Sequence, residues 1–376
     1  MIVRNGLVFG ADFKFEKYDL ECNNGIITDI APTGSLSGEA VDVCGAYVVP
    51  GFVDIHTHGC VNCDFSDADS KGIEKMLSYY GKNGVTSVAA TTMSLDEETL
   101  CRVMQIAAPY FGKKGYGAVL RAVNMEGPFL NKARCGAQKP ENIIAPDTAF
   151  FERLYDLSGG NIRLIDLAPE MQGTLEFIRH VKAFPVSVSL AHTSADYECA
   201  AAVFKAGACH VTHMFNAMPA FGHREPGVIG AAFDHADFAE IICDGVHLHP
   251  SVVRAVFAMF GKDRLCLVSD SIRATGMPDG EYELGGQIAI LKDGRSNLAV
   301  GGAIAGSAAN LLNCFRNAVK FGIPLETALQ SATINPARAI SADSAVGSLE
   351  IGKAADFLVL NSDLEIINTY IGGERF

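Results

Sequence analysis

The chain has 376 residues, enough for one large domain and a small one, and a net charge of −13 that argues against nonspecific nucleic-acid binding. No run approaches the roughly 18 apolar residues of a membrane helix, and the start of the chain lacks the pattern of a secretory signal. The 11 cysteines are scattered along the chain, which is typical of reduced thiols. We therefore expect a cytoplasmic protein with no nucleic-acid partner and no membrane partner.

Both ends of the chain have the character of short β segments. In residues 1–50, Asn24 and Gly25 form the pair that is preferred in a two-residue hairpin turn. Residues 346–376 repeat this character, with a strand-like run at 356–360. Neither piece could bury a core alone, so we expect 1–50 and 346–376 to pair as one small β-sandwich domain.

Between these ends, short apolar runs recur at regular intervals, and each closes on a polar or charged residue. The runs are 50–58, 86–92, 119–126, 162–169, 186–192, 210–213, 239–244 and 264–270. Helix-like segments follow at 71–83, 96–111, 147–157, 171–183, 195–206, 251–260 and 307–321. This alternation predicts an α/β chain whose residues 51–345 form a (β/α)8 TIM barrel. A doubly wound open sheet is the competing fold, but no Gly-x-Gly-x-x-Gly turn follows the first run.

Four residues indicate where these helices begin or end. Pro250 stands at a first helical position, and Gly207 is placed as a C-terminal cap. Ser307 is the expected N-cap of the last helix, and Gly322 is the expected stop of that helix.

The first apolar run carries His56 and His58, two residues apart. Residues i and i+2 of a strand point to the same face, so the two imidazoles project side by side. Neutral imidazole is a good nitrogen ligand for a divalent metal, and a rigid strand holds both rings in fixed positions. The alternative is that the His-x-His pattern is incidental. The polar residues at the ends of the later strands decide between a metal site and this alternative.

Further polar residues close the later runs, namely Glu126, His192, His213 and Asp270. A single one of them could be a hydrogen-bonded rim residue or a helix cap. In a barrel, however, the carboxyl ends of all strands meet at one rim. Four histidines and two carboxylates at that rim predict a metal site that suits zinc, iron, manganese or cobalt better than calcium or magnesium.

Cys60 and Cys63 form a Cys-x-x-Cys directly after the histidine pair. A redox or zinc-binding role is one interpretation. No second such motif exists, so two thiols in a loop are the simpler interpretation.

These residues carry a resemblance to the amidohydrolase superfamily and, over essentially the whole chain, to its N-acetylglucosamine-6-phosphate deacetylase family. The matching blocks are 50–59, 126–129, 136–138, 167–170, 191–193, 212–218, 223–227, 244–247, 269–271 and 304–307. The resemblance implies hydrolysis of the acetamide of N-acetyl-D-glucosamine 6-phosphate, which gives glucosamine 6-phosphate and acetate.

The resemblance also implies a metal centre. Glu126, His192 and His213 match the site found throughout these deacetylases. This chain keeps both His56 and His58, so we expect a second ion beside them, bridged by Glu126 and touching Asp270. We expect two divalent ions per subunit, zinc or iron first and manganese or cobalt as alternatives. Asp270 resembles the general base that takes a proton from water and hands it to the departing amine.

The matched substrate-binding positions are Ala137, Gln138, Asn216, Ala217, Arg224, His247, Ile304, Ala305 and Gly306. Gln138 stands where many members have a histidine that holds the substrate carbonyl, and its amide can still donate a hydrogen bond. Arg224 is expected to bind the 6-phosphate bidentately. By resemblance it does so from the neighbouring subunit of a homodimer.

Three alternatives stay open. A dihydroorotase- or hydantoinase-like cyclic amidase shares the barrel and the metals, but typically bridges them with a modified lysine where this chain has Glu126. A deacetylase of N-acetylgalactosamine 6-phosphate differs only in substrate stereochemistry. A non-catalytic scaffold on the same fold would be marked by lost metal ligands, and none of the six is lost.

Overall fold

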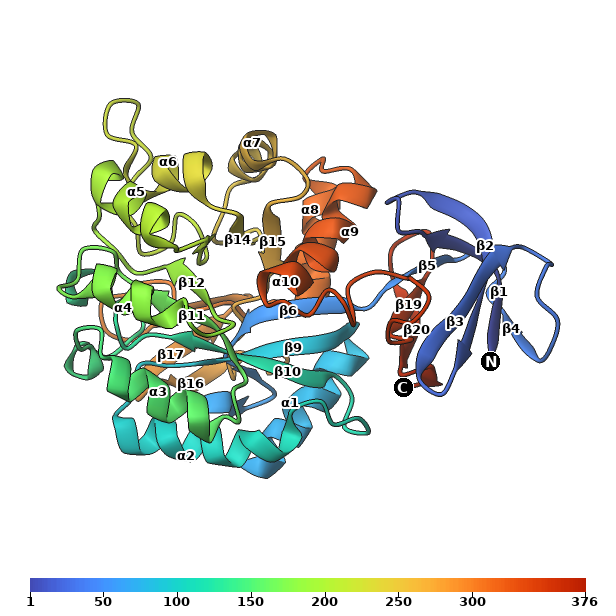
Figure 1. Ribbon diagram of the computed structural model, residues 1–376, viewed down its shortest axis with the longest axis horizontal. Helices are drawn as coiled ribbons and strands as arrows, with labels where there is room; N and C mark the ends of the chain where they lie inside the picture. The colour runs from blue at the N-terminus through green and yellow to red at the C-terminus, as the bar shows by residue number, and fades with distance from the viewer.

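A computed structural model describes residues 1–376 as a barrel with a small β domain beside it (Figure 1). The barrel is one parallel sheet in the order β6-β9-β10-β11-β12-β13-β14-β15. Its strands are β6 (Phe52–Thr57), β9 (Val85–Thr92), β10 (Val119–Glu126), β11 (Ile162–Leu167), β12 (Ser187–Leu190), β13 (His210–Val211), β14 (Phe238–Ile242) and β15 (Leu265–Val268). The Asp270 N–H donates to the His56 carbonyl at 2.9 Å just beyond β15, which brings the end strands together. The predicted TIM barrel is confirmed.

Helices surround this sheet (Figure 1). They are α1 (Ser70–Lys82), α2 (Glu97–Ala107), α3 (Thr148–Leu157), α4 (Thr174–Val181), α5 (Tyr197–Ala206), α6 (Gly227–His235), α7 (Pro250–Phe260), α8 (Leu311–Lys320), α9 (Leu325–Ala332) and α10 (Ile334–Ala339). Seven of them match the predicted segments, and α6, α9 and α10 were not anticipated. Helix α6 contains two glycines and has no side-chain N-cap, so it gives little signal in the sequence. No helix of the structure has both the length and the apolar character that crossing a lipid bilayer requires.

The helix ends agree with three of the four expected positions. Pro250 is the first residue of α7, Gly207 caps α5, and Gly322 follows the end of α8 with a φ of 99°. The expected N-cap Ser307 is wrong. Helix α8 begins after Asn310, whose side chain accepts a hydrogen bond from the Asn313 N–H at 3.0 Å.

Strands from both ends of the chain form the sheet of the small domain, in the order β21-β20-β19-β5-β1-β2-β3, with β4 paired to β1. They are β1 (Ile2–Phe9), β2 (Phe15–Asn23), β3 (Ile26–Pro32), β4 (Ala40–Asp42), β5 (Tyr47–Pro50), β19 (Phe357–Leu360), β20 (Ile366–Ile371) and β21 (Glu374–Arg375). Side chains of both termini, among them Leu20, Val48 and Phe357, pack into one buried cluster. The predicted turn at Asn24 and Gly25 is present, with positive φ at both residues.

Two small hairpin structures were not anticipated. Strands β16 (Gly280–Leu284), β17 (Gln287–Lys292) and β18 (Arg295–Leu298) form an antiparallel sheet between β15 and α8. This sheet packs through Leu284 and Leu291 onto Ile272, which follows β15. The second is the hairpin of β7 (Gly59–Cys60) and β8 (Cys63–Asp64), in which Cys60 lies opposite Cys63. Both thiols are buried in the apolar core and unpaired.

Candidate active site

A cavity of about 390 Å³ lies at the carboxyl ends of the barrel strands. Most of the expected site residues line it: His58, Glu126, Ala137, Gln138, His192, His213, Asn216, Ala217, His247, Asp270, Ile304 and Gly306. His56 lies directly beneath this lining and is fully buried. The barrel therefore brings residues from six of its strands and their following loops to one place.

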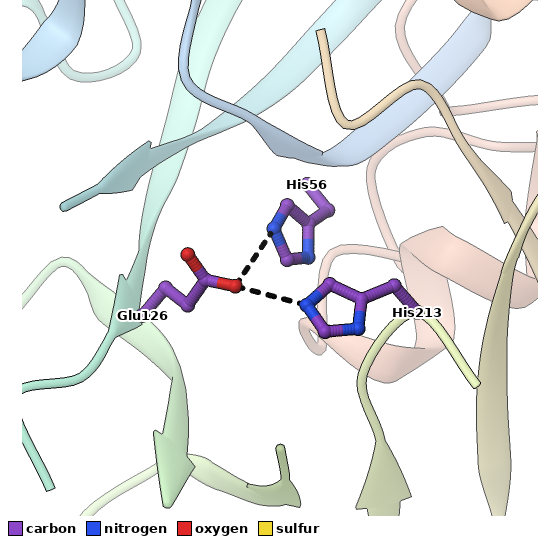
Figure 2. Close-up of side chains that lie close together, drawn as sticks. All are labelled: His56, Glu126 and His213. Carbon is purple, nitrogen blue, oxygen red and sulfur yellow. Dashed lines mark hydrogen bonds and ion pairs between the residues drawn. The ribbon is translucent and has the colours of Figure 1, made fainter. Parts of the chain in front are cut away.

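Glu126, the last residue of β10, stands at the centre of the polar group. Its Oε1 lies 3.0 Å from Nε2 of His213 and 3.6 Å from Nε2 of His56 (Figure 2). The same oxygen is 3.2 Å from Nε2 of His192. Its Oε2 lies 3.4 Å from Nε2 of His58. One oxygen of this carboxylate thus faces three imidazoles, and the other oxygen faces the fourth.

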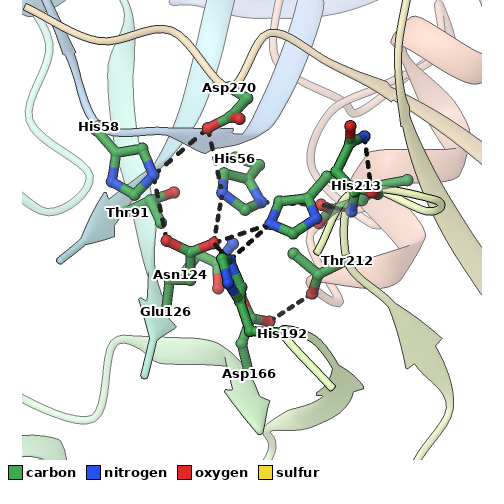
Figure 3. A network of polar contacts seen from close by, with 12 residues as sticks. His56, His58, Thr91, Asn124, Glu126, Asp166, His192, Thr212, His213 and Asp270 are labelled. Carbon is green, nitrogen blue, oxygen red and sulfur yellow. Dashed lines mark hydrogen bonds and ion pairs between the residues drawn. The ribbon is translucent and has the colours of Figure 1, made fainter. Parts of the chain in front are cut away.

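Asp270 faces the histidine pair of β6 from the other side (Figure 3). Its Oδ1 lies 3.6 Å from Nε2 of His56 and 3.4 Å from Nε2 of His58. Two overlapping groups can therefore each surround a metal ion, with donor atoms within 4.8 Å of one another. One is His56, Glu126 and His213, and the other is His56, His58 and Asp270.

The unpaired polar atoms of this site fit a metal ion. His56 Nε2 is buried and has no hydrogen-bond partner, although an unpaired buried nitrogen is costly. His192 Nδ1 lies 2.8 Å from the Arg134 carbonyl, which can only accept, so Nδ1 carries a proton and the other ring nitrogen, Nε2, faces Glu126. Imidazole nitrogens with carboxylate oxygens are the ligand set of zinc, iron, manganese and cobalt.

The histidines also determine the charge state of the two carboxylates. Burial by itself raises the pKa of Glu126, but hydrogen bonds and charge from His192 and His213 hold that pKa well below its ordinary value. Burial likewise raises the pKa of Asp270, but a hydrogen bond from His58 and the charge of His56 outweigh it, and the net pKa is lowered. Both carboxylates are therefore ionised and able to face a cation.

Three of the expected metal-site residues have backbone conformations that L-amino acids rarely adopt. The φ angles of His192, His213 and Asp270 are 43°, 25° and 48°, and each residue lies two positions beyond the end of its strand. Such left-handed residues are strained, and strain of this kind clusters at functional sites. The strained turn after each of these strands is thus located at the residue whose side chain faces the cavity.

His247 lines the cavity away from the metal ligands. Its Nδ1 lies 2.8 Å from Oδ2 of Asp244, and that oxygen also accepts from the Ser307 hydroxyl at 3.0 Å. Burial lowers the pKa of His247, but Asp244 more than offsets this and the net pKa is raised. This pair provides a polar group with a fixed orientation in the cavity wall.

Gln138 is oriented differently from the expectation. Its Oε1 accepts the Ser94 N–H at 2.7 Å, and its Nε2 donates to Oε2 of Glu126. The amide that was expected to hold a substrate carbonyl therefore faces Glu126, one of the expected metal ligands.

Two of the expected substrate-binding residues do not line the cavity. Arg224 is exposed on the loop before α6, and Ala305 is buried behind the cavity wall. Conversely, the rim carries Arg134, a cation that the sequence did not single out. It lies in a single-turn 3-10 helix, η3 (Lys132–Arg134), which is too short to give a periodic signal.

A buried acid beneath the site, Glu240, was also missed. It lies in the middle of β14, whereas the predicted site residues lie at the ends of strands. The signal was present nonetheless, because a lone glutamate between apolar residues in a buried strand calls for a partner.

Comparison with known proteins identifies the family. The amidohydrolase family model matches residues 47–376. The chain is 35% identical to N-acetylglucosamine-6-phosphate deacetylase of Bacillus subtilis (strain 168) over 359 residues, 93% of this chain and 90% of the relative. It is 31% identical to N-acetylgalactosamine-6-phosphate deacetylase of Escherichia coli O157:H7, over 96% of this chain and 94% of that relative.

Solved structures agree with this relationship. A variant of N-acetyl-D-glucosamine-6-phosphate deacetylase from Mycobacterium smegmatis, in complex with N-acetyl-D-glucosamine-6-phosphate, superposes with a TM-score of 0.93 at 31% identity. That match covers 100% of this chain and 98% of the other. The Thermotoga maritima enzyme has a TM-score of 0.88 at 28% identity, over 100% and 99% of the two chains. The chain belongs to the N-acetylglucosamine-6-phosphate deacetylase family of the amidohydrolases.

Proposed function

We propose that this protein hydrolyses the acetamide of N-acetyl-D-glucosamine 6-phosphate to glucosamine 6-phosphate and acetate, a step of amino-sugar catabolism. One observation carries the proposal. The Glu126 carboxylate lies among four imidazoles at the base of a cavity, with Asp270 facing two of them. Relatives of 31–35% identity over nearly the whole chain carry the name of this activity or of its galactosamine counterpart.

We infer that two divalent ions, zinc or iron first, would be held here. His192 and His213 would hold one, His56, His58 and Asp270 the other, and Glu126 would stand between them. A divalent cation at such a site supplies a Lewis acid that favours attack by water on an amide carbonyl.

The protein's own groups account for the proton transfers. Asp270 is ionised and borders the cavity, so its carboxylate can accept a proton from the attacking water. The same group then returns that proton to the nitrogen of the departing amine. Asp270 lies just beyond the barrel strand β15, and this anchorage keeps its carboxylate in one position through both transfers.

The remaining cavity residues are proposed to bind the sugar phosphate. Asn216, Ala217 and His247 line one wall, and Ile304 and Gly306 line another. Ala137, Gln138 and Ala305 belong to the loops that shape these walls. Arg224 is proposed to reach the 6-phosphate from the neighbouring subunit of a homodimer, since it is exposed and lies outside the cavity of its own chain.

The eleven cysteines are all unpaired, which supports a cytoplasmic, reducing location. The rival cyclic amidases would place a modified lysine where Glu126 lies. A scaffold without activity would have no reason to keep six converging ligands.

Acetate release is the direct test. Phosphorylated and unphosphorylated N-acetylglucosamine and N-acetylgalactosamine are offered to one preparation whose metal content is measured. We expect the phosphorylated glucosamine derivative to be the best substrate. Preference for the galactosamine derivative would favour the second candidate, which the relative from Escherichia coli O157:H7 represents. No release from any of them would contradict the proposal.

A further inference from the structure

We propose that Glu240 is a positioning residue that makes His56 a metal ligand by holding the proton of its imidazole on Nδ1. The inference rests on the proposed metal-dependent function. It concerns a residue that touches neither the cavity nor any proposed substrate group.

Glu240 lies in the middle of β14, and none of its surface is exposed. A carboxylate buried to this degree is costly unless hydrogen bonds or charges compensate it. Its Oε2 lies 2.8 Å from Nδ1 of His56 and accepts the backbone N–H of His213 at 3.1 Å. One oxygen thus contacts two of the residues proposed to ligate metal, one on β6 and the other just beyond β13.

These two contacts determine which nitrogen of His56 carries the proton. The N–H of His213 can only donate, so Oε2 of Glu240 is an acceptor. Two acceptors would repel at 2.8 Å, and Nδ1 of His56 must therefore donate. In the neutral ring Nε2 is then left with a free electron pair.

That free nitrogen points where a ligand is needed. Nε2 of His56 lies 3.6 Å from both Oε1 of Glu126 and Oδ1 of Asp270, and it has no hydrogen-bond partner. His56 belongs to both groups of residues that could hold an ion. A hydrogen bond that the far ring nitrogen donates to a buried carboxylate is a common means of orienting a metal-binding histidine.

Two substitutions separate the hydrogen bond from simple packing. Glu240→Gln keeps an acceptor oxygen for His56 and His213, whereas Glu240→Met has a similar length and offers none. Asp166→Asn is the matched control, because Asp166 on β11 is equally buried and accepts from Thr212 at 2.8 Å. It makes no hydrogen bond to a proposed ligand.

The readout is metal affinity, measured by titrating metal-depleted protein with Co²⁺ against a chelator while the visible absorption of bound cobalt is recorded. Glu240→Met should weaken binding by about 10- to 100-fold. Glu240→Gln and Asp166→Asn should stay within about threefold of the parent. Parental affinity in Glu240→Met, or equal losses in Glu240→Gln or Asp166→Asn, would overturn the proposal.

A measurement on the parent protein covers the case in which Glu240→Met does not fold. Multiple-bond ¹H–¹⁵N spectra of zinc-loaded, ¹⁵N-histidine-labelled protein report the tautomer of each ring, and His56→Gln identifies the signal. We expect a proton on Nδ1 of His56, and a proton on Nε2 would overturn the assignment. If the proposed function itself failed, the parent would release no acetate while these metal-binding differences persisted.

Discussion

At the residue scale, Asp270 carries the most specific chemical claim. Asp270→Asn keeps the size of the side chain but removes the proton acceptor, so turnover should fall by about 10²-fold or more. Substrate binding should change little. Steady-state kinetics together with equilibrium binding of the substrate measure both quantities. Turnover within a few-fold of the parent would assign the base to another group.

The two sides of the metal centre should respond differently to loss of a histidine. His58 contacts Oε2 of Glu126, whereas His192 contacts Oε1 on the other side. His58→Gln should lower bound metal from about two ions per chain towards one, with some activity retained. His192→Gln should be more damaging to activity. Elemental analysis that finds one ion or none in the active, undepleted parent would contradict the two-metal expectation.

Most residues of the candidate site could be predicted from the sequence, because a barrel places every strand end at one rim. His58, Glu126 and Asp270 each close an apolar run, and the structure brings them together. Glu240 was not predicted as a site residue because it lies inside a strand and not at its end. The actual contacts of Gln138 depend on loop geometry, which no spacing in the sequence encodes.

At the scale of single elements, the start of α8 gives a test that separates two neighbouring polar residues. Asn310 caps this helix, and Ser307 instead donates to Asp244, the partner of His247. Asn310→Ala should lower the free energy of unfolding by about 1 kcal/mol. Ser307→Ala should have a smaller effect on stability and should raise KM for the phosphorylated sugar.

Denaturant titration and steady-state kinetics on both variants decide this prediction. A larger loss of stability in Ser307→Ala than in Asn310→Ala would restore the cap that the sequence suggested.

The elements that the sequence predicted have strong periodicity or clear end signals. The barrel strands are apolar and closely spaced, and α5 and α7 have readable caps at Gly207 and Pro250. The sheet of β16–β18 was missed because its strands alternate buried and exposed residues over only four to six positions. Such short segments in a long connection are easily taken for loop.

At the scale of the whole molecule, the position of Arg224 requires a second subunit if it binds the phosphate. Arg224→Ala should raise KM for the phosphorylated sugar strongly, because hydrogen bonds to charged groups contribute about 1.5–3 kcal/mol each. Slow turnover of the unphosphorylated sugar should hardly change. Arg134→Ala is the informative comparison, since Arg134 lines the cavity of its own chain.

Mixed dimers test the shared site directly. Chains with Arg224→Ala and chains with Asp270→Asn are combined, and activity should return where one intact site forms across the interface. Verified heterodimers without any recovery would confine Arg224 to its own chain. An unchanged KM in Arg224→Ala would remove that side chain from phosphate binding.

The sheet that joins both ends of the chain also affects the order of events on the ribosome. Strand β5 hydrogen-bonds with β1 on one side and with β19 on the other, yet β19 is translated only after the whole barrel. Until then the nascent protein carries an open edge on β5, and such edges recruit other chains. Arrival of β19 covers that edge. A chain whose translation stops before β19 therefore keeps this edge of β5 unpaired.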